Sequence, residues 1–67
     1  MSWTFECEFR RETEDAQLVV LTDKGQFVWF PLSQVEERHG RRNPDGKFHG
    51  SGEITVSDWI AEKKGLA

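Results

Sequence analysis

Two short apolar runs on either side of a polar turn place the strongest constraint on how this chain folds. Residues 18–21 read LVVL and residues 27–30 read FVWF, and between them lies the polar stretch TDKGQ with Gly25. β-branched and aromatic residues favour pleated strands, and glycine adopts the positive φ that tight turns need. The stretch therefore predicts a β-hairpin. Because neither run alternates apolar with polar residues, both faces of this hairpin need cover, either from the rest of the chain or from another protein.

The length of the chain limits how much of that cover it can provide itself. We expect its 67 residues to form a single domain, and at this size folding buries only about 60% of the surface that the unfolded chain exposes. Three Trp and five Phe enlarge the core, but Cys7 is the only cysteine, so no intramolecular disulfide is available. Chains of this size often gain stability by self-association, so we predict a homodimer.

Alternation identifies the first strand most clearly. Residues 3–10 alternate apolar with polar side chains, which is the pattern of a strand with one buried face. Cys7 falls on that face, so we expect a small buried hydrophobe and not a reactive thiol. The expected strands are 3–10, 16–22, 26–31 and 53–56. The expected core consists of Phe5, Phe9, Leu18, Val20, Trp29, Ile54, Trp59 and Ile60.

Capping signals predict one helix near the end of the sequence. Ser57 is a favourable N-cap, and Asp58 suits the positive end of the helix dipole. Gly65 suits the position after the C-cap, where Leu66 can fold back onto the helix. We therefore expect a helix over residues 58–64 that docks on the sheet and covers one face of the central hairpin.

A second, shorter helical turn is expected directly after the hairpin. Pro31 lacks an amide donor, so the preceding strand should end there or lie at a sheet edge. Ser33 and Glu36 have the spacing of a capping box, which predicts one or two helical turns. Together these elements predict an α+β fold: a small antiparallel β-sheet of three to four strands, open or barrel-like, with one short C-terminal helix packed on it.

Charge is distributed unevenly along the chain, although the formal net charge is only −3. Residues 1–37 contain eight acidic and three basic residues, a balance of −5, whereas residues 38–49 contain four basic residues and one acidic residue, a balance of +3. Within the polar segment 37–51, the sequence Asn43-Pro44-Asp45-Gly46 is a strong turn signal. A connector of about fifteen residues is long for a compact domain, so we expect a functional basic loop at 37–51.

This basic loop is the predicted partner-binding site. Basic side chains suit phosphate groups, and flat side chains suit stacking against nucleic-acid bases. The candidate residues are Arg38, His39, Arg41, Arg42, Lys47, Phe48 and His49. A single-stranded nucleic acid is therefore one candidate partner. The acidic remainder of the chain favours a protein partner with a basic surface, which is the preferred alternative.

Catalytic, metal and membrane functions have no recognisable sequence signal, so we expect a chain that is not an enzyme and holds no cofactor. Gly50-Ser51-Gly52 precedes a strand and does not join a strand to a helix, so it is not predicted to hold a nucleotide. Cys7, His39 and His49 lack the spacing of metal ligands. The absence of a leader sequence and of a long apolar stretch predicts a soluble, cytoplasmic protein.

Two sequence blocks together resemble a group of small uncharacterised proteins from bacteriophages and prophages. The first is a hairpin that ends in Trp-hydrophobic-Pro-x-Ser, here Trp29, Pro31 and Ser33. The second is a C-terminal strand and helix, here ITVSDWIAEKKGL over residues 54–66. Leu32 departs from the lysine expected at that position, and the segment 37–51 is longer and more basic than in the group. The resemblance implies a phage origin, and with it a place in the host-cell cytoplasm, but it implies no mechanism. Small phage proteins commonly act by occupying a surface on a host protein, so we expect association with a host or phage protein.

Overall fold

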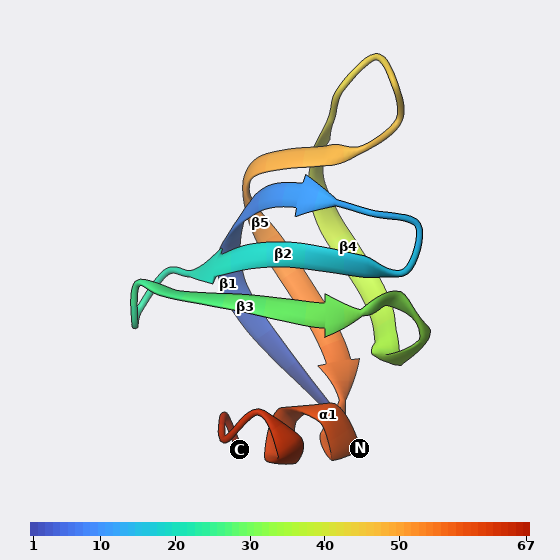
Figure 1. The fold of residues 1–67 in the computed structure, drawn as a ribbon. Coiled ribbons are helices and arrows are strands. Elements are labelled where there is room, and N and C mark those ends of the chain that lie inside the picture. Colours follow the sequence, from blue (N-terminus) through green and yellow to red (C-terminus); the bar gives the residue numbers. More distant parts are fainter.

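A computed structural model describes all 67 residues of the chain as a curved β-sheet with a short helix at one end (Figure 1). The elements are β1 (Ser2–Glu12), β2 (Ala16–Leu21), β3 (Gln26–Pro31), the 3-10 helix η1 (Leu32–Gln34), β4 (Val35–Arg42), β5 (Phe48–Ser57) and α1 (Asp58–Lys63). All strand pairs are antiparallel, in the order β3-β2-β1-β5-β4. The prediction of a small antiparallel sheet with one short C-terminal helix is therefore confirmed.

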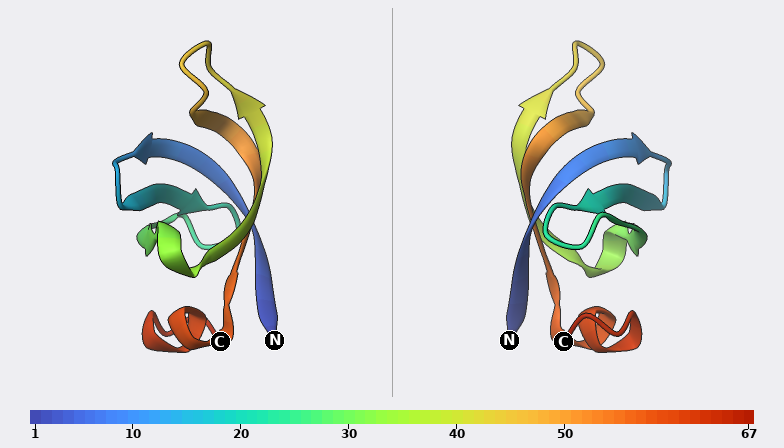
Figure 2. Two further views of the ribbon diagram at one scale, coloured as in Figure 1. Left: turned by 90° about the vertical axis from the view of Figure 1, so that its right-hand side faces the viewer. Right: turned by 90° about the vertical axis from the view of Figure 1, so that its left-hand side faces the viewer.

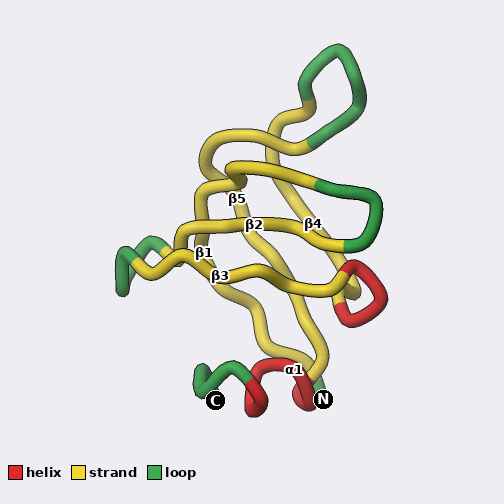
Figure 3. The backbone as a smooth tube through the Cα atoms, viewed as in Figure 1, coloured by secondary structure: helices red, strands yellow, loops and turns green.

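The sheet has five strands, more than the three to four predicted, and it does not close into a barrel. β4 has the sequence VEERHGRR, whose single apolar residue gives no strand pattern. It pairs with β5, which begins at Phe48 and not at residue 53 as predicted. β3 and β4 stand at the two ends of the strand order and do not pair with each other. Most of the segment 37–51 is thus a β-hairpin that projects from the body, and not the loop predicted (Figure 3).

The two longest strands, β1 and β5, pair at the centre and bend together, so that the sheet curves around one face (Figure 2). At the bend, Gly40 of β4 lies opposite Gly52 of β5, and the ring of Phe9 packs against both glycines. A β-carbon on Gly52 would overlap the carbonyl oxygen of His39 and lie 2.7 Å from the Phe9 ring. The second glycine of Gly50-Ser51-Gly52 therefore has a packing role.

The core lies on the inner, concave face of the sheet. Its buried residues are Cys7, Phe9, Val19, Leu21, Val28, Phe30, Phe48, Ile54, Val56, Ile60 and Ala61. The ring of Phe5 stacks between those of Trp3 and Phe30, with ring centroids 6.4 and 6.5 Å apart. Among the predicted core residues, Phe9, Ile54 and Ile60 are buried and Phe5 is partly buried. The first strand thus turns inward the face that its alternation predicts.

The central hairpin turns inward the opposite face from the one predicted. Val19 and Val28 are buried, whereas Leu18 and Val20 are only partly buried and Trp29 is 41% exposed. Since side chains alternate along a strand, an error of one residue exchanges the two faces completely. The sequence offered no means to choose, because both faces of this hairpin are apolar.

The capping residues of α1 behave as predicted. The Ser57 hydroxyl accepts a hydrogen bond from the Ile60 amide, which is the expected N-cap. Gly65 has a φ of +73°, and the Leu66 amide donates to the carbonyl of Ala61. This is the Schellman pattern, and it folds Leu66 back against the core.

α1 docks through two of the three apolar residues expected to face the sheet. Ile60 and Ala61 are buried, but Trp59 is 58% exposed and its ring lies 4.9 Å from Nζ of Lys63. The prediction that Trp59 belongs to the core is therefore wrong. The helix packs mainly against β1 and β5, so it leaves the outer face of the central hairpin uncovered. With six residues in α1, no helix combines the length and apolar content that crossing a membrane requires.

The first strand and the helix are tied together at one end of the molecule. Nε1 of Trp3 donates a hydrogen bond of 2.6 Å to Oδ1 of Asp58, and this bond lowers the pKa of the Asp58 carboxyl below its usual range. The Asp58 amide also donates to the carbonyl of Met1. Both chain ends lie at the end of the molecule opposite the tip of the β4–β5 hairpin (Figure 2).

Both predicted turns are confirmed, but the predicted cap of the short helical turn is not. Gly25 has a φ of +63°, and the Gly46 amide donates a 2.8 Å bond to the carbonyl of Asn43 as in a type I turn. η1 begins at Leu32, and no side chain caps it. Ser33 lies inside this turn because Pro31, with its fixed φ, takes the position before it.

We expect Gly52→Ala to lower the free energy of unfolding by about 1–3 kcal/mol, the usual cost of overpacking a core. The added methyl group would displace the Phe9 ring or separate β4 from β5. Urea denaturation followed by circular dichroism measures this change. Ser51→Ala at the exposed neighbouring position is the control, with an expected change within about 0.5 kcal/mol. Equal stability of the two variants would show that the Phe9 ring does not depend on this glycine.

Candidate functional site

The β4–β5 hairpin carries all seven residues of the predicted partner-binding site, but it distributes them over two faces. The strand register places Arg38 opposite Ile54 and Arg42 opposite Phe48, on the side of the core. The outer side carries His39, Arg41 and His49. Lys47 is exposed beside the turn at the tip, where its carbonyl accepts a 2.7 Å hydrogen bond from the Asn43 amide. The sequence prediction of one continuous basic and aromatic surface therefore corresponds to two separate groups.

Phe48 is buried and belongs to the core. Its ring packs against that of Phe9, with centroids 5.1 Å apart. The guanidinium carbons of Arg38 and Arg42 lie 4.7 and 4.4 Å from the centroid of the Phe48 ring. Because two cations and the core already cover this ring, it offers no free face on which a nucleic-acid base could stack.

Arg38 holds a polar network together beneath β4. Its Nη1 donates to Oε1 of Glu12 and to Oε1 of Gln17, each at 2.9 Å. Gln17 is fully buried, and its Nε2 donates to the carbonyl oxygens of Arg11 and Leu18. Each polar atom of the buried amide thus has a partner, as burial requires. The charge of Arg38 is neutralised by Glu12, so this arginine serves the fold.

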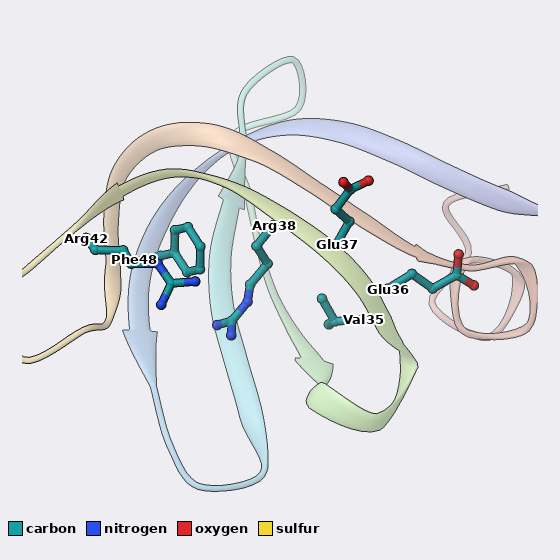
Figure 4. A pocket seen from close by; sticks show the side chains of 6 residues that line it. All are labelled: Val35, Glu36, Glu37, Arg38, Arg42 and Phe48. Carbon is teal, nitrogen blue, oxygen red and sulfur yellow. The ribbon is translucent and has the colours of Figure 1, made fainter.

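An open pocket of about 240 Å³ lies beside this network, lined by Val35, Glu36, Glu37, Arg38, Arg42 and Phe48. In Figure 4 the two arginines and Phe48 point to one side of β4, and Glu37 points to the other. Arg42 donates to the carbonyl of Gly46 at the hairpin turn and forms no ion pair. The pocket is therefore a shallow hollow lined by two arginines and two glutamates, and it does not enclose a substrate.

The two histidines that flank the turn are not brought together. His39 lies opposite Glu53, and His49 lies opposite Arg41. Nε2 of His39 lies 3.0 Å from a carboxylate oxygen of Glu37 on the same strand. No group of three or more His, Cys, Asp or Glu side chains is arranged so that it could hold a metal ion.

Cys7 is buried on the inner face, as predicted. Burial raises the pKa of its thiol to about 12, and the nearby carboxylate of Glu53 adds to this effect. The thiol is therefore neutral at physiological pH, which agrees with its expected place as a small hydrophobe.

A surface that the site prediction missed lies on the outer face of the central hairpin. Cross-strand pairs place Leu18 beside Trp29 and Val20 beside Phe27. Phe27 is 63% exposed and Trp29 is 41% exposed. We call these four residues the outer-face patch. The signal for it was present in the sequence, because the two apolar runs lack alternation and must therefore display apolar side chains on both faces.

An acidic border adjoins the outer-face patch. Glu8 lies directly opposite Val20, and Glu6 lies directly opposite Glu53. A hydrogen bond of 2.9 Å between the hydroxyls of Thr4 and Thr55 marks the same outer face. We call Glu6, Glu8 and Glu53 the acidic border. An open hollow of about 340 Å³ beside it is lined by Glu6, Cys7, Thr22, Ser51, Gly52 and Glu53.

Comparisons with known proteins found no matching family model and no significant match among curated proteins or solved structures. The resemblance to small phage proteins therefore stays a prediction. The functional argument consequently depends on the surfaces of the chain itself.

We expect Arg38→Ala to lower the free energy of unfolding by about 1–3 kcal/mol, because it leaves the buried amide oxygen of Gln17 without a donor. Thermal and urea denaturation measure the change. Arg41→Ala removes the same type of side chain from the outer side of the hairpin, where it forms no ion pair, and should change stability by less than about 0.5 kcal/mol. If both variants are as stable as the parent, Arg38 is free to face a partner and its structural assignment is wrong.

Proposed function

We propose that this chain is a small non-catalytic protein of bacteriophage type that acts by binding a host or phage protein. The observation that supports the proposal is the outer-face patch, where Phe27 and Trp29 stand side by side in solvent next to Leu18 and Val20. Contiguous apolar surface on a small protein commonly marks an interaction site. The proposed setting is the cytoplasm of the host cell, and this mode of action needs no catalytic residue and no cofactor.

The two aromatic side chains provide the anchoring groups of the proposed interaction. Burying an aromatic side chain completely removes about 150–250 Å² from water. The 63% of Phe27 and the 41% of Trp29 that remain exposed thus leave roughly 200 Å² to cover. At about 25 cal/mol per Å², a partner that covers both side chains gains roughly 5 kcal/mol. Aromatic residues of this kind dominate the binding energy of many protein interfaces.

A second copy of the chain is another protein that this patch can bind, as the predicted homodimer requires. Stable interfaces bury about 800 Å² per partner, several times the aromatic area available here. A homodimer formed through the outer-face patch alone would therefore be weak. Sedimentation of the free protein at micromolar concentration measures its oligomeric state. A single species near 7.8 kDa, the mass of one chain, would exclude the homodimer.

We expect the double variant Phe27→Ser/Trp29→Ser to lose at least nine tenths of the partner protein that the parent captures from a bacterial lysate. Both side chains point into solvent, so their removal should leave the fold intact while it removes the anchoring surface. Affinity capture followed by quantitative mass spectrometry measures the loss.

The control for this measurement is Trp59→Ser, which removes an exposed tryptophan from α1, away from the outer-face patch. It should capture the same proteins as the parent in the same amounts. Circular dichroism establishes that both variants are folded. Equal capture by the parent and the Phe27→Ser/Trp29→Ser variant would place the binding surface elsewhere, with the β4–β5 hairpin as the next candidate.

Single-stranded nucleic acid is the alternative partner, and it has less support. Phe48 is buried and Arg38 is neutralised, so two of the seven candidate residues serve the fold. The observation that still favours this partner is the group of exposed cations near the hairpin tip, Arg41, Arg42 and Lys47, none of which forms an ion pair.

If this alternative holds, binding of a single-stranded DNA oligonucleotide should weaken as salt is added. A plot of the logarithm of the association constant against the logarithm of the salt concentration should have a slope no steeper than about −2, because three cations contribute about −0.7 each. Fluorescence anisotropy across a range of salt concentrations measures the slope. Arg41→Glu/Arg42→Glu should abolish binding. Undetectable binding of the parent at low salt would eliminate the nucleic-acid alternative.

A further inference from the structure

The outer face of the sheet combines two kinds of surface in direct contact. Glu8 of the acidic border lies opposite Val20 of the outer-face patch, and neighbouring strands are about 4.8 Å apart. Charged and apolar groups therefore meet within the reach of a single side chain. A partner that binds here must satisfy both surfaces at once.

The acidic border contains carboxylates that the chain itself leaves uncompensated. Glu6 and Glu53 face each other directly across β1 and β5, an arrangement that destabilises a sheet through like-charge repulsion. Neither of them forms an ion pair, whereas Glu8 contacts Arg10 at 2.7 Å.

The neighbouring histidine does not relieve this repulsion. His39 lies opposite Glu53 in the strand register, but its Nε2 contacts Glu37 instead. The hollow of about 340 Å³ between Glu6 and Glu53 also presents Thr22 and Ser51. A cationic side chain placed in this hollow would reduce the repulsion and find oxygen atoms as hydrogen-bond acceptors.

From this arrangement we infer that the outer face docks a segment of another protein in which lysine or arginine lies next to an apolar side chain. The apolar side chain covers Phe27 and Trp29, and the basic side chain enters the hollow between Glu6 and Glu53. This inference rests on the proposed function and specifies the chemistry of the partner. Proteins with a basic surface, such as DNA-binding proteins of the host, form the class of partner whose charge fits this face.

Charge complementarity separates this partner from the other occupants of the face. A second copy of the chain would present the same acidic border and the same net charge of −3, so its approach is opposed by repulsion. The phosphates of a nucleic acid would meet the carboxylates of Glu6 and Glu53 and would be repelled as well. A basic and apolar protein segment is the only one of the three that both parts of the face attract.

Short synthetic peptides of matched length test this inference directly. One probe repeats Leu-Leu-Lys-Lys, the second Leu-Leu-Glu-Glu and the third Ser-Ser-Lys-Lys, so that each side of an extended peptide presents both of its residue types. Isothermal titration and amide chemical-shift changes over β1, β2 and β3 report binding. We expect the leucine–lysine peptide to bind at least tenfold more tightly than either of the others, with an affinity that falls as salt is added.

Charge-neutral variants then locate the contact. Glu6→Gln/Glu53→Gln should weaken binding of the leucine–lysine peptide about tenfold, and it should raise the denaturation midpoint because the facing charges are gone. The control Glu14→Gln/Glu62→Gln changes the net charge by the same amount at exposed positions in the β1–β2 turn and on α1. It should leave the affinity within about twofold of the parent.

Each contrary result overturns a different claim. The basic partner is overturned if the leucine–glutamate peptide binds as tightly as the leucine–lysine peptide. It is also overturned if both double glutamine variants weaken binding by the same factor. In either case the capture experiment on Phe27 and Trp29 can still succeed, so the proposed function is tested separately. Equal binding of the serine–lysine peptide removes the role of the aromatic side chains and overturns the proposed function itself. Failure of all three peptides to bind overturns the inference.

Discussion

The contact between the Phe9 ring and the glycine pair Gly40 and Gly52 determines the shape of this molecule. Without side chains on the two glycines, β4 and β5 approach the ring closely, and the long central strands can bend around it. The bend gives a chain of 67 residues an inner face that it can fill completely. The apolar side chains that could cover the outer face of the central hairpin belong to this core, so that face stays exposed to solvent. The surface proposed for binding is therefore a consequence of how the core is built.

The basic hairpin illustrates how one composition serves two purposes. Arg38 looks like a phosphate ligand in the sequence, but the buried amide of Gln17 requires its guanidinium as a donor. Phe48 looks like a stacking platform, but Phe9 requires it as a neighbour in the core. The fold requires such residues, because an unpaired buried amide or a missing ring lowers the free energy of unfolding directly. Only side chains that make no such contact within the fold are free to bind a partner.

Local signals predicted the parts of this fold that depend on neighbouring residues. The Ser57 cap, the left-handed Gly65 and the Asn43–Gly46 turn follow from chemistry within a few positions, and the structure has all three.

The predictions that failed concern contacts between residues far apart in the sequence. β4 carries no apolar pattern because Arg38 and Arg42, and not apolar side chains, lie over the Phe48 ring. The inward face of the central hairpin could not be chosen because both of its faces are apolar. Trp59 was assigned to the core because it lies on the apolar side of the predicted helix, whereas the helix docks through Ile60 and Ala61. The missing alternation could have predicted the outer-face patch, if one face of the hairpin had been assigned to solvent and not to a covering helix.

The position of both chain ends at one end of the molecule has a practical meaning for how such a module is used. Met1 and Asp58 share a backbone hydrogen bond, and the Trp3 indole reinforces the junction. A second protein joined to either end would therefore lie on the side of α1, while the exposed Asn43–Gly46 turn stays free at the opposite end of the molecule. Such an attachment would leave the tip of the β4–β5 hairpin directed away from the added protein.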